Sequence, residues 1–98
     1  MAATRTDGEA IAASVRDPAA FVPVFDRHFG AIRRYLARRL GSDLGGELAA
    51  ETFTRAFDAR GRYDTSRADA LPWLYGIAAN LVRRHLRAEE RRLHAYAQ

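Results

Sequence analysis

A run of apolar residues between positions 21 and 40 constrains the fold of this chain most strongly. Its members recur at spacings of four and three residues, the period of one helix face: Phe21, Phe25, Phe29, Ile32, Leu36 and Leu40. Asp17 and Pro18 precede the run as a helix cap and a first-turn proline, and Gly41 follows it as a C-cap. This pattern predicts one long helix over residues 18–40.

The rest of the chain also favours helices. No stretch alternates with period two, and alanine, leucine and arginine dominate the sequence. We therefore predict an all-α fold, a compact bundle of three main helices and a short N-terminal helix. The expected main helices span residues 18–40, 46–60 and 71–95, and the short helix runs from Gly8 to Val15.

Helix breakers set the remaining boundaries. Gly45 and Gly46 are expected to delay the start of the second main helix. Asp69 and Pro72 are typical of a helix start and predict where the last one begins. We expect residues 1–98 to form one domain, with residues 1–16 as an N-terminal arm and residues 61–70 as a loop.

Composition excludes several classes of protein. The chain has 98 residues, enough for one modest core. It has no cysteine, which excludes disulfides and thiolate metal sites and favours a cytoplasmic protein. No apolar run approaches the roughly 20 residues of a membrane helix, and the N-terminus lacks the features of a secretory signal.

Positive charge is carried by arginine alone. All 16 basic residues are arginine and the net charge is +4, a composition that fits either phosphate recognition or codon bias in a GC-rich genome. Their placement is more informative, because a polar stripe occupies one face of the last expected helix: Asn80, Arg84, Arg87 and Arg91, flanked by Arg83 and Arg92. The stripe indicates either nucleic-acid binding or a solvated helix face.

Two further features are candidates for function. The loop 61–70 is long for a compact domain, which is typical of a functional loop. On the second main helix, Glu47 and Glu51 stand one turn apart with no basic residue between them. This pair fits a docking face for a cationic partner, or an ordinary acidic first turn stabilised by the helix dipole.

Catalysis has no residue set to support it. We find no glycine-rich phosphate loop, no zinc-ligand spacing and no Ser-His-Asp arrangement, so we expect neither an enzyme nor a metal or other cofactor. His28 is interpreted as a packed or surface residue, and Trp73 as a core residue.

The sequence resembles region 2 of bacterial sigma factors, and most closely the extracytoplasmic-function (ECF) type with an actinobacterial character. The resemblance covers about Phe21 to Ala95. It rests on three segments, FDRHFGAIRRYLARRLG, ELAAETFTRAFDARGRYD and ALPWLYGIAANLVRRHLRAEERR.

The resemblance implies a role in transcription initiation with two partners. One is core RNA polymerase, whose beta-prime coiled coil would bind the second main helix through Glu47, Leu48, Glu51, Thr52 and Arg55. The other is promoter DNA, because region 2 opens the −10 element and captures a flipped non-template base. An anti-sigma protein that covers region 2 is a further partner that the family implies.

The resemblance also assigns DNA-binding residues. The loop before the last helix would form the base pocket with Asn80 at its base, and arginines would hold the strand's phosphates: Tyr63, Asp64, Thr65, Ser66, Arg67 and Ala68 in the loop, then Arg83, Arg84 and Arg87. Flipping a base costs a few kcal/mol, which such a pocket and a positive groove offset.

Some features depart from the family pattern. Glu47 stands where aspartate is usual, and Gly45 and Gly46 replace a more helix-friendly lead-in. Region 4, the second domain of a complete ECF factor, is absent from these 98 residues, so we expect either a truncated chain or one separated domain. Two other classes stay open, a protein-interaction module bound by an anti-sigma factor and an unrelated helix-turn-helix regulator.

Overall fold

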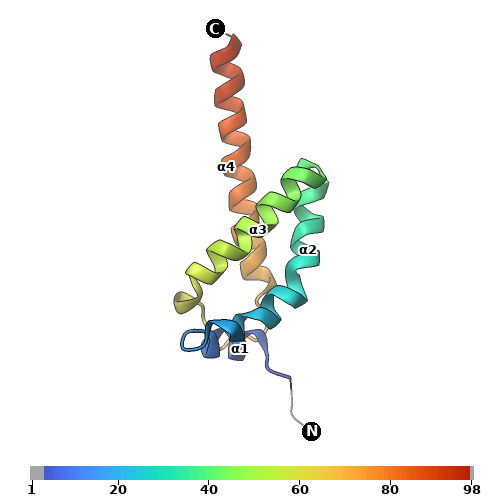
Figure 1. Ribbon diagram of the computed structural model, residues 1–98. Helices are drawn as coiled ribbons and strands as arrows, with labels where there is room; N and C mark the ends of the chain where they lie inside the picture. Colours follow the sequence, from blue (N-terminus) through green and yellow to red (C-terminus); the bar gives the residue numbers. More distant parts are fainter. Residues whose placement is uncertain (1–3, 98) are drawn as a thin grey trace.

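A computed structural model describes residues 4–97, and within that range the chain is all-α without strands (Figure 1). The predicted fold class is therefore confirmed. The elements, in order, are α1 (Asp7–Ser14), a 3₁₀ turn η1 (Pro18–Phe21), α2 (Val22–Leu40), α3 (Ser42–Asp58), a 3₁₀ turn η2 (Arg60–Arg62) and α4 (Leu71–Ala97). The first three residues of the predicted N-terminal arm, and Gln98, lie outside the described residues.

The predicted helix over residues 18–40 is divided into two parts. Residues Pro18–Phe21 form a 3₁₀ turn, and the α-helix begins only at Val22. Pro23 explains the division, because a proline has no N–H to donate to the carbonyl four residues earlier. Asp17 lies at the N-cap of the turn, but its side chain makes no capping hydrogen bond.

The second main helix starts earlier than predicted. Helix α3 begins at Ser42 and runs through both Gly45 and Gly46, so the expected break at these glycines is wrong. The turn between α2 and α3 is Gly41 alone, which has φ of 86° and thus a conformation that favours glycine. A Cβ on Gly45 would lie 2.7 Å from the Ala37 backbone. Gly45 therefore allows α2 and α3 to approach closely just after the turn.

The core lies where α2, α3 and the first half of α4 meet, and α1 contacts α2 at the lower end of the bundle (Figure 1). It contains aliphatic and aromatic side chains from every helix, with aromatic rings of α2 packed on α3: Ile11, Val24, Ile32, Leu36, Phe53, Leu74 and Ala78. The predicted stripe on α2 is right in period. Val24 is nevertheless buried while Phe25 stays 40% exposed.

Helix α4 is longer than the bundle that supports it. Its 27 residues extend to Ala97, about 40 Å at 1.5 Å per residue, and its outer end projects beyond the other helices (Figure 1). Side chains from Arg91 onward are exposed. Among residues 4–97, no helix is both long and apolar enough to cross a membrane.

Candidate nucleic-acid and partner interface

The loop between η2 and α4 is irregular but closely held. Its first residue, Tyr63, is buried and packs against Trp73 of α4, with ring centroids 4.7 Å apart. The Tyr63 hydroxyl donates to the Arg67 carbonyl at 3.1 Å and so closes the loop on itself. Burial, with the nearby Asp7 and Asp69 carboxylates, raises the pKa of Tyr63 and keeps this hydroxyl a donor.

The predicted base-reading side chains point outward. Every side chain from Asp64 to Ala68 is exposed, while Ala70 is buried. Asp64 accepts hydrogen bonds from the Ser66 backbone N–H at 3.1 Å and from its hydroxyl at 2.6 Å, and these bonds lower the pKa of Asp64. Asp69 lies one residue before the cap position Ala70, whose carbonyl accepts the first helical bond from the Leu74 N–H. Its carboxylate nevertheless accepts from the Leu71 N–H at 2.9 Å and so satisfies the first N–H of α4.

A hollow of about 400 Å³ lies beside this loop. It is lined by Arg62, Tyr63, Asp64, Arg67, Asp69, Pro72 and Trp73, and its size falls in the range of roughly 300–1,000 Å³ of small-ligand sites. Asn80, which was expected at the base of the pocket, is not among the described residues that line it. It lies two turns farther along α4.

Two grooves continue from this hollow along α4. The first shares Arg62 and Trp73 with the hollow and adds Asn80, Arg83 and Arg55. The second shares Asn80 and Arg55 with the first and runs outward between α3 and α4, past Arg84, Arg87 and Arg91. We call the hollow and the two grooves together the arginine track. The sequence reasoning missed Arg62, whose only signal was a basic residue directly before the loop.

The predicted polymerase-binding residues occupy different environments. Glu47 is exposed, Leu48 is half-buried, and Leu48 and Glu51 line the outer groove beside the arginines of α4. The carboxylate of Glu51 is paired with a cation, because Arg55 donates two hydrogen bonds to it at 3.2 and 2.9 Å. Arg55 thus lies between the two predicted surfaces.

Thr52 does not lie on the surface. Its side chain is 0% exposed, and its hydroxyl donates to the Leu48 carbonyl at 2.7 Å. The i, i+4 spacing that placed Thr52 beside Leu48 also turns it toward the core. Its burial removes Thr52 from the predicted docking surface.

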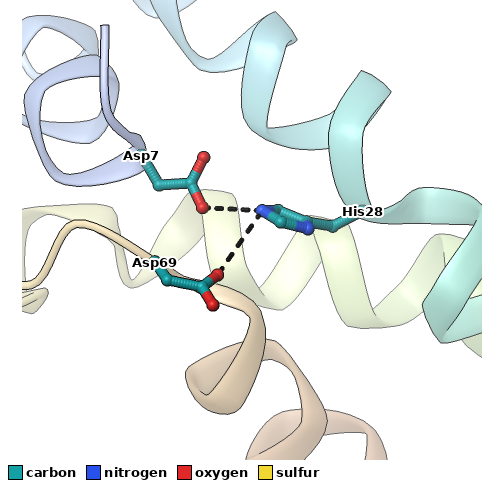
Figure 2. Close-up of side chains that lie close together, drawn as sticks. All are labelled: Asp7, His28 and Asp69. Carbon is teal, nitrogen blue, oxygen red and sulfur yellow. Dashed lines mark hydrogen bonds and ion pairs between the residues drawn. The ribbon is translucent and has the colours of Figure 1, made fainter.

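A buried cluster at the base of the loop was missed by the sequence reasoning. The Asp7 carboxylate accepts a hydrogen bond from His28 Nε2 at 2.6 Å (Figure 2). It also accepts from Arg27 at 2.9 Å and from the Ala70 N–H at 2.8 Å. Burial alone would raise the pKa of Asp7, but these bonds outweigh it and lower the pKa. The carboxylate is therefore ionised, and His28 Nε2 is the donor.

This cluster has the composition of a metal site, but its Asp7 and His28 atoms are engaged in hydrogen bonds with one another and with their neighbours. Ligand atoms of Asp7, His28 and Asp69 lie within 4.8 Å of one another. However, Oδ2 of Asp7 already accepts from both His28 and Ala70, and the Arg27 guanidinium contacts Oδ1. These three donors occupy most of the roughly four acceptor positions of the carboxylate, and His28 Nε2 carries a proton rather than a free lone pair. We therefore interpret the cluster as a structural junction between α1, α2 and the loop.

Comparison with known proteins identifies a family and a relative. The family model Sigma-70 region 2 matches residues 24–92, more than half of the chain. RNA polymerase sigma factor CarQ of Myxococcus xanthus is 38% identical over 79 residues, which cover 80% of this chain and 44% of that protein. The chain thus spans less than half the length of this relative. No solved structure matched the chain significantly.

The three segments that resemble sigma factor region 2 in sequence also form the main helices of the bundle and the loop before α4. The family match extends from the beginning of α2 to the outer part of α4 and contains the whole loop and all of α3. The predicted sigma region 2 domain is confirmed by this match and by the relative. The chain belongs to the Sigma-70 region 2 family.

Proposed function

We propose that this domain acts in transcription initiation by binding the non-template strand of the promoter −10 element and docking on core RNA polymerase. The observation that carries the proposal is the continuity of the arginine track. A hollow that could accept one flipped base shares Arg62 and Trp73 with a groove whose arginines could hold the phosphates next to it.

The residue types differ along the arginine track, and this difference supports the proposed function. Exposed loop side chains with both donors and acceptors, such as Asp64, Ser66 and Arg67, suit the edges of a base. Arginines on the rigid helix α4 suit phosphates, which fix position without reading sequence. Trp73 forms one wall of the hollow, so a captured base would find an aromatic surface there.

The test is binding to single-stranded non-template oligonucleotides at several salt concentrations. We expect the −10 sequence to bind more tightly than a scrambled sequence, and Arg67→Ala, which removes a side chain that lines the hollow, to reduce discrimination at one base. Arg84→Ala and Arg87→Ala should weaken both sequences and lower the salt slope by about 0.7 per lost phosphate contact. Arg16→Ala, an exposed arginine outside the track, is the control. Equal affinity for both sequences in the wild type would refute base capture.

We also propose that α3 docks on the beta-prime coiled coil of the polymerase. Its exposed Glu47 suits a basic partner, and a cation of the partner would replace Arg55 in the pair that Arg55 makes with Glu51. The half-buried Leu48 offers an apolar contact. Glu51→Lys should abolish this association, because the new ammonium would repel both the partner and Arg55. Asp26→Lys makes the same charge change on an exposed part of α2 and should bind normally. Unchanged binding by Glu51→Lys would mean that the docking face is elsewhere.

A protein partner such as an anti-sigma factor is favoured by a separate observation. An apolar hollow between η1, the start of α2 and α3 is lined by Pro18, Phe21, Val22, Phe25, Ala50, Phe53, Thr54 and Phe57. Val22 is 52% exposed there. Phe25→Ser should weaken a protein partner that covers this hollow without changing oligonucleotide affinity.

A helix-turn-helix regulator fits less well. The short turn at Gly41 precedes α3, which would then be the helix that enters the major groove. That helix presents Asp43, Glu47 and Asp58 to solvent, and these carboxylates would repel phosphates. Tighter binding to duplex than to single-stranded DNA would revive this alternative.

A further inference from the structure

The loop is held at its base by the beginning of α1. The Asp7 N–H donates to the Ala68 carbonyl at 2.9 Å, and the Ala70 N–H donates to the Asp7 carboxylate at 2.8 Å. One residue of α1 thus bonds the loop backbone on both sides of Asp69. Long-range bonds of this kind hold a segment in one conformation that its own sequence does not impose.

Gly8 brings α1 still closer to the loop. A Cβ built on Gly8 would lie 2.3 Å from the Thr65 carbonyl oxygen and 2.5 Å from that of Arg67. No side chain fits at this position without displacing the loop backbone. Asp7 and Gly8 therefore lie against the loop backbone at several points between Thr65 and Ala70.

The same junction is tied to the bundle. His28 of α2 donates to the Asp7 carboxylate (Figure 2), and so does its neighbour Arg27. Ala10 and Ile11 of α1 are completely buried in the core. The loop is thus positioned relative to α2 as well as α1. Any change in the register between α1 and α2 would reach the loop through Asp7.

These contacts involve loop backbone atoms and leave the loop side chains free. The groups that α1 bonds or closely approaches are carbonyls and an N–H, while the side chains of Thr65, Ser66 and Arg67 are exposed. Substitution of these loop side chains would therefore leave the contacts between α1 and the loop backbone intact. A reading loop that must hold one shape while its side chains select a base needs such a support.

We propose that Asp7 is a positioning residue for base recognition, holding loop 63–70 in its reading conformation through the backbone of Ala68 and Ala70. The inference rests on the proposed function of the loop. Asp7 itself would not touch DNA, since it is buried beneath the loop. Its effect would appear in sequence discrimination rather than in overall affinity, because the arginines of α4 do not depend on it.

Two readouts on the same variants test the proposal. Hydrogen exchange of the Ala70 amide and quenching of Trp73, the one tryptophan in the chain, report on the loop directly. The ratio of affinities for the −10 and scrambled oligonucleotides reports on reading. Asp7→Asn should speed exchange at Ala70, make Trp73 easier to quench and reduce the affinity ratio roughly tenfold. Affinity for the scrambled oligonucleotide should not change.

Controls separate the loop effect from loss of folding. Asp26→Asn removes an exposed carboxylate from the same bundle and should match the wild type in both readouts. Gly8→Ala leaves the Asp7 carboxylate in place and displaces the loop backbone, so it should reproduce the loss of discrimination if Asp7→Asn fails to fold. Gly46→Ala, whose new Cβ would meet only the Arg33 side chain at 3.8 Å, is its control.

The outcomes distinguish this inference from the proposed function. If the Asp7→Asn variant folds and its Ala70 exchange and Trp73 quenching are unchanged, the positioning role is overturned, whatever the ratio of oligonucleotide affinities. A loosened loop with full discrimination would overturn its importance for reading. If the wild type does not discriminate, the proposed function fails, and the exchange and quenching data still decide whether Asp7 holds the loop.

Discussion

The two regions predicted to contact DNA, loop 63–70 and the outer half of α4, owe their order to opposite causes. The loop has no regular structure, yet its backbone is bonded to Asp7, a residue more than 60 positions away. The outer half of α4 is a regular helix whose residues beyond Arg91 are exposed. Its order comes from hydrogen bonds within the helix, whereas the order of the loop comes from a few local bonds together with distant contacts.

This difference matches the two tasks of a strand-binding surface. Reading a base requires a fixed arrangement of polar groups, which only long-range contacts give to an irregular segment. Holding phosphates requires charge at helical spacing, and a helix keeps that spacing after most surface substitutions. We therefore expect substitutions in the support of the loop to change specificity, and substitutions on outer α4 to change affinity.

The largest expected effect comes from replacing leucine by alanine at the two ends of α4. Leu74 is 0% exposed in the core near the loop, whereas Leu93 is 63% exposed on the outer half. Leu74→Ala should lower the free energy of unfolding by about 2–5 kcal/mol, because it leaves a cavity. Leu93→Ala should change it by less than about 0.5 kcal/mol. Urea unfolding followed by circular dichroism measures both.

A similar loss of stability in both leucine variants would contradict the comparison. It would mean that the outer half of α4 is covered in solution, for example by a second copy of the chain. Repeating the Leu93→Ala measurement over a range of protein concentrations would identify that case, since stability gained by association rises with concentration.

A smaller effect tests the same contrast between packed and open positions inside α3. Gly45→Ala would press a methyl group into the Ala37 backbone, and should destabilise the protein by about 1–3 kcal/mol. Gly46→Ala meets only ordinary contact and should stabilise it by about 0.5–1 kcal/mol, since alanine favours a helix interior. Thermal unfolding of the two single variants measures the difference. Stabilisation by Gly45→Ala would show that the helices are farther apart.

The elements with strong local signals were predictable from the sequence. Periodic apolar residues and capping signals gave four helices in the right order, and the short N-terminal helix was right to within one residue. The errors came where distant contacts decide. Gly45 was read as a helix breaker because its propensity is local, whereas its role is the close approach to Ala37, which no spacing in the sequence reveals.

The candidate site divides in the same way. The helical face of Asn80, Arg84, Arg87 and Arg91 was predictable from spacing, and these residues do line one groove. Thr52 was misplaced, because its neighbours on the helix do not tell whether a small polar residue faces inward. Asp7 was missed altogether. Its partners lie 20 to 63 positions away, and a buried acid in a short helix has no pattern of its own.

The smallest expected effect compares one carboxylate from each region. Asp7 beneath the loop and Glu89 on outer α4 both have a lowered pKa, the latter because of its hydrogen bond and ion pair with Arg92. A carboxyl group with a lowered pKa stabilises the fold at pH values above its ordinary pKa, which is 3.8 for Asp7 and 4.5 for Glu89. This contribution is lost as the pH falls through the value in the folded protein. The Glu89 pair is exposed, so salt should screen it, and the buried Asp7 bonds should be little affected.

Unfolding midpoints in urea, measured from pH 6 to pH 2 at about 0.1 M and 1 M salt, separate the two carboxylates. Asp7→Asn should flatten the loss of stability below pH 3.8 at both salt concentrations, because the asparagine cannot be protonated in this range. Glu89→Gln should have a small effect at low salt and none at high salt. If high salt removed the Asp7 effect as well, its carboxylate would have to be accessible to solvent. The loop would then lack the buried support that distinguishes it from outer α4.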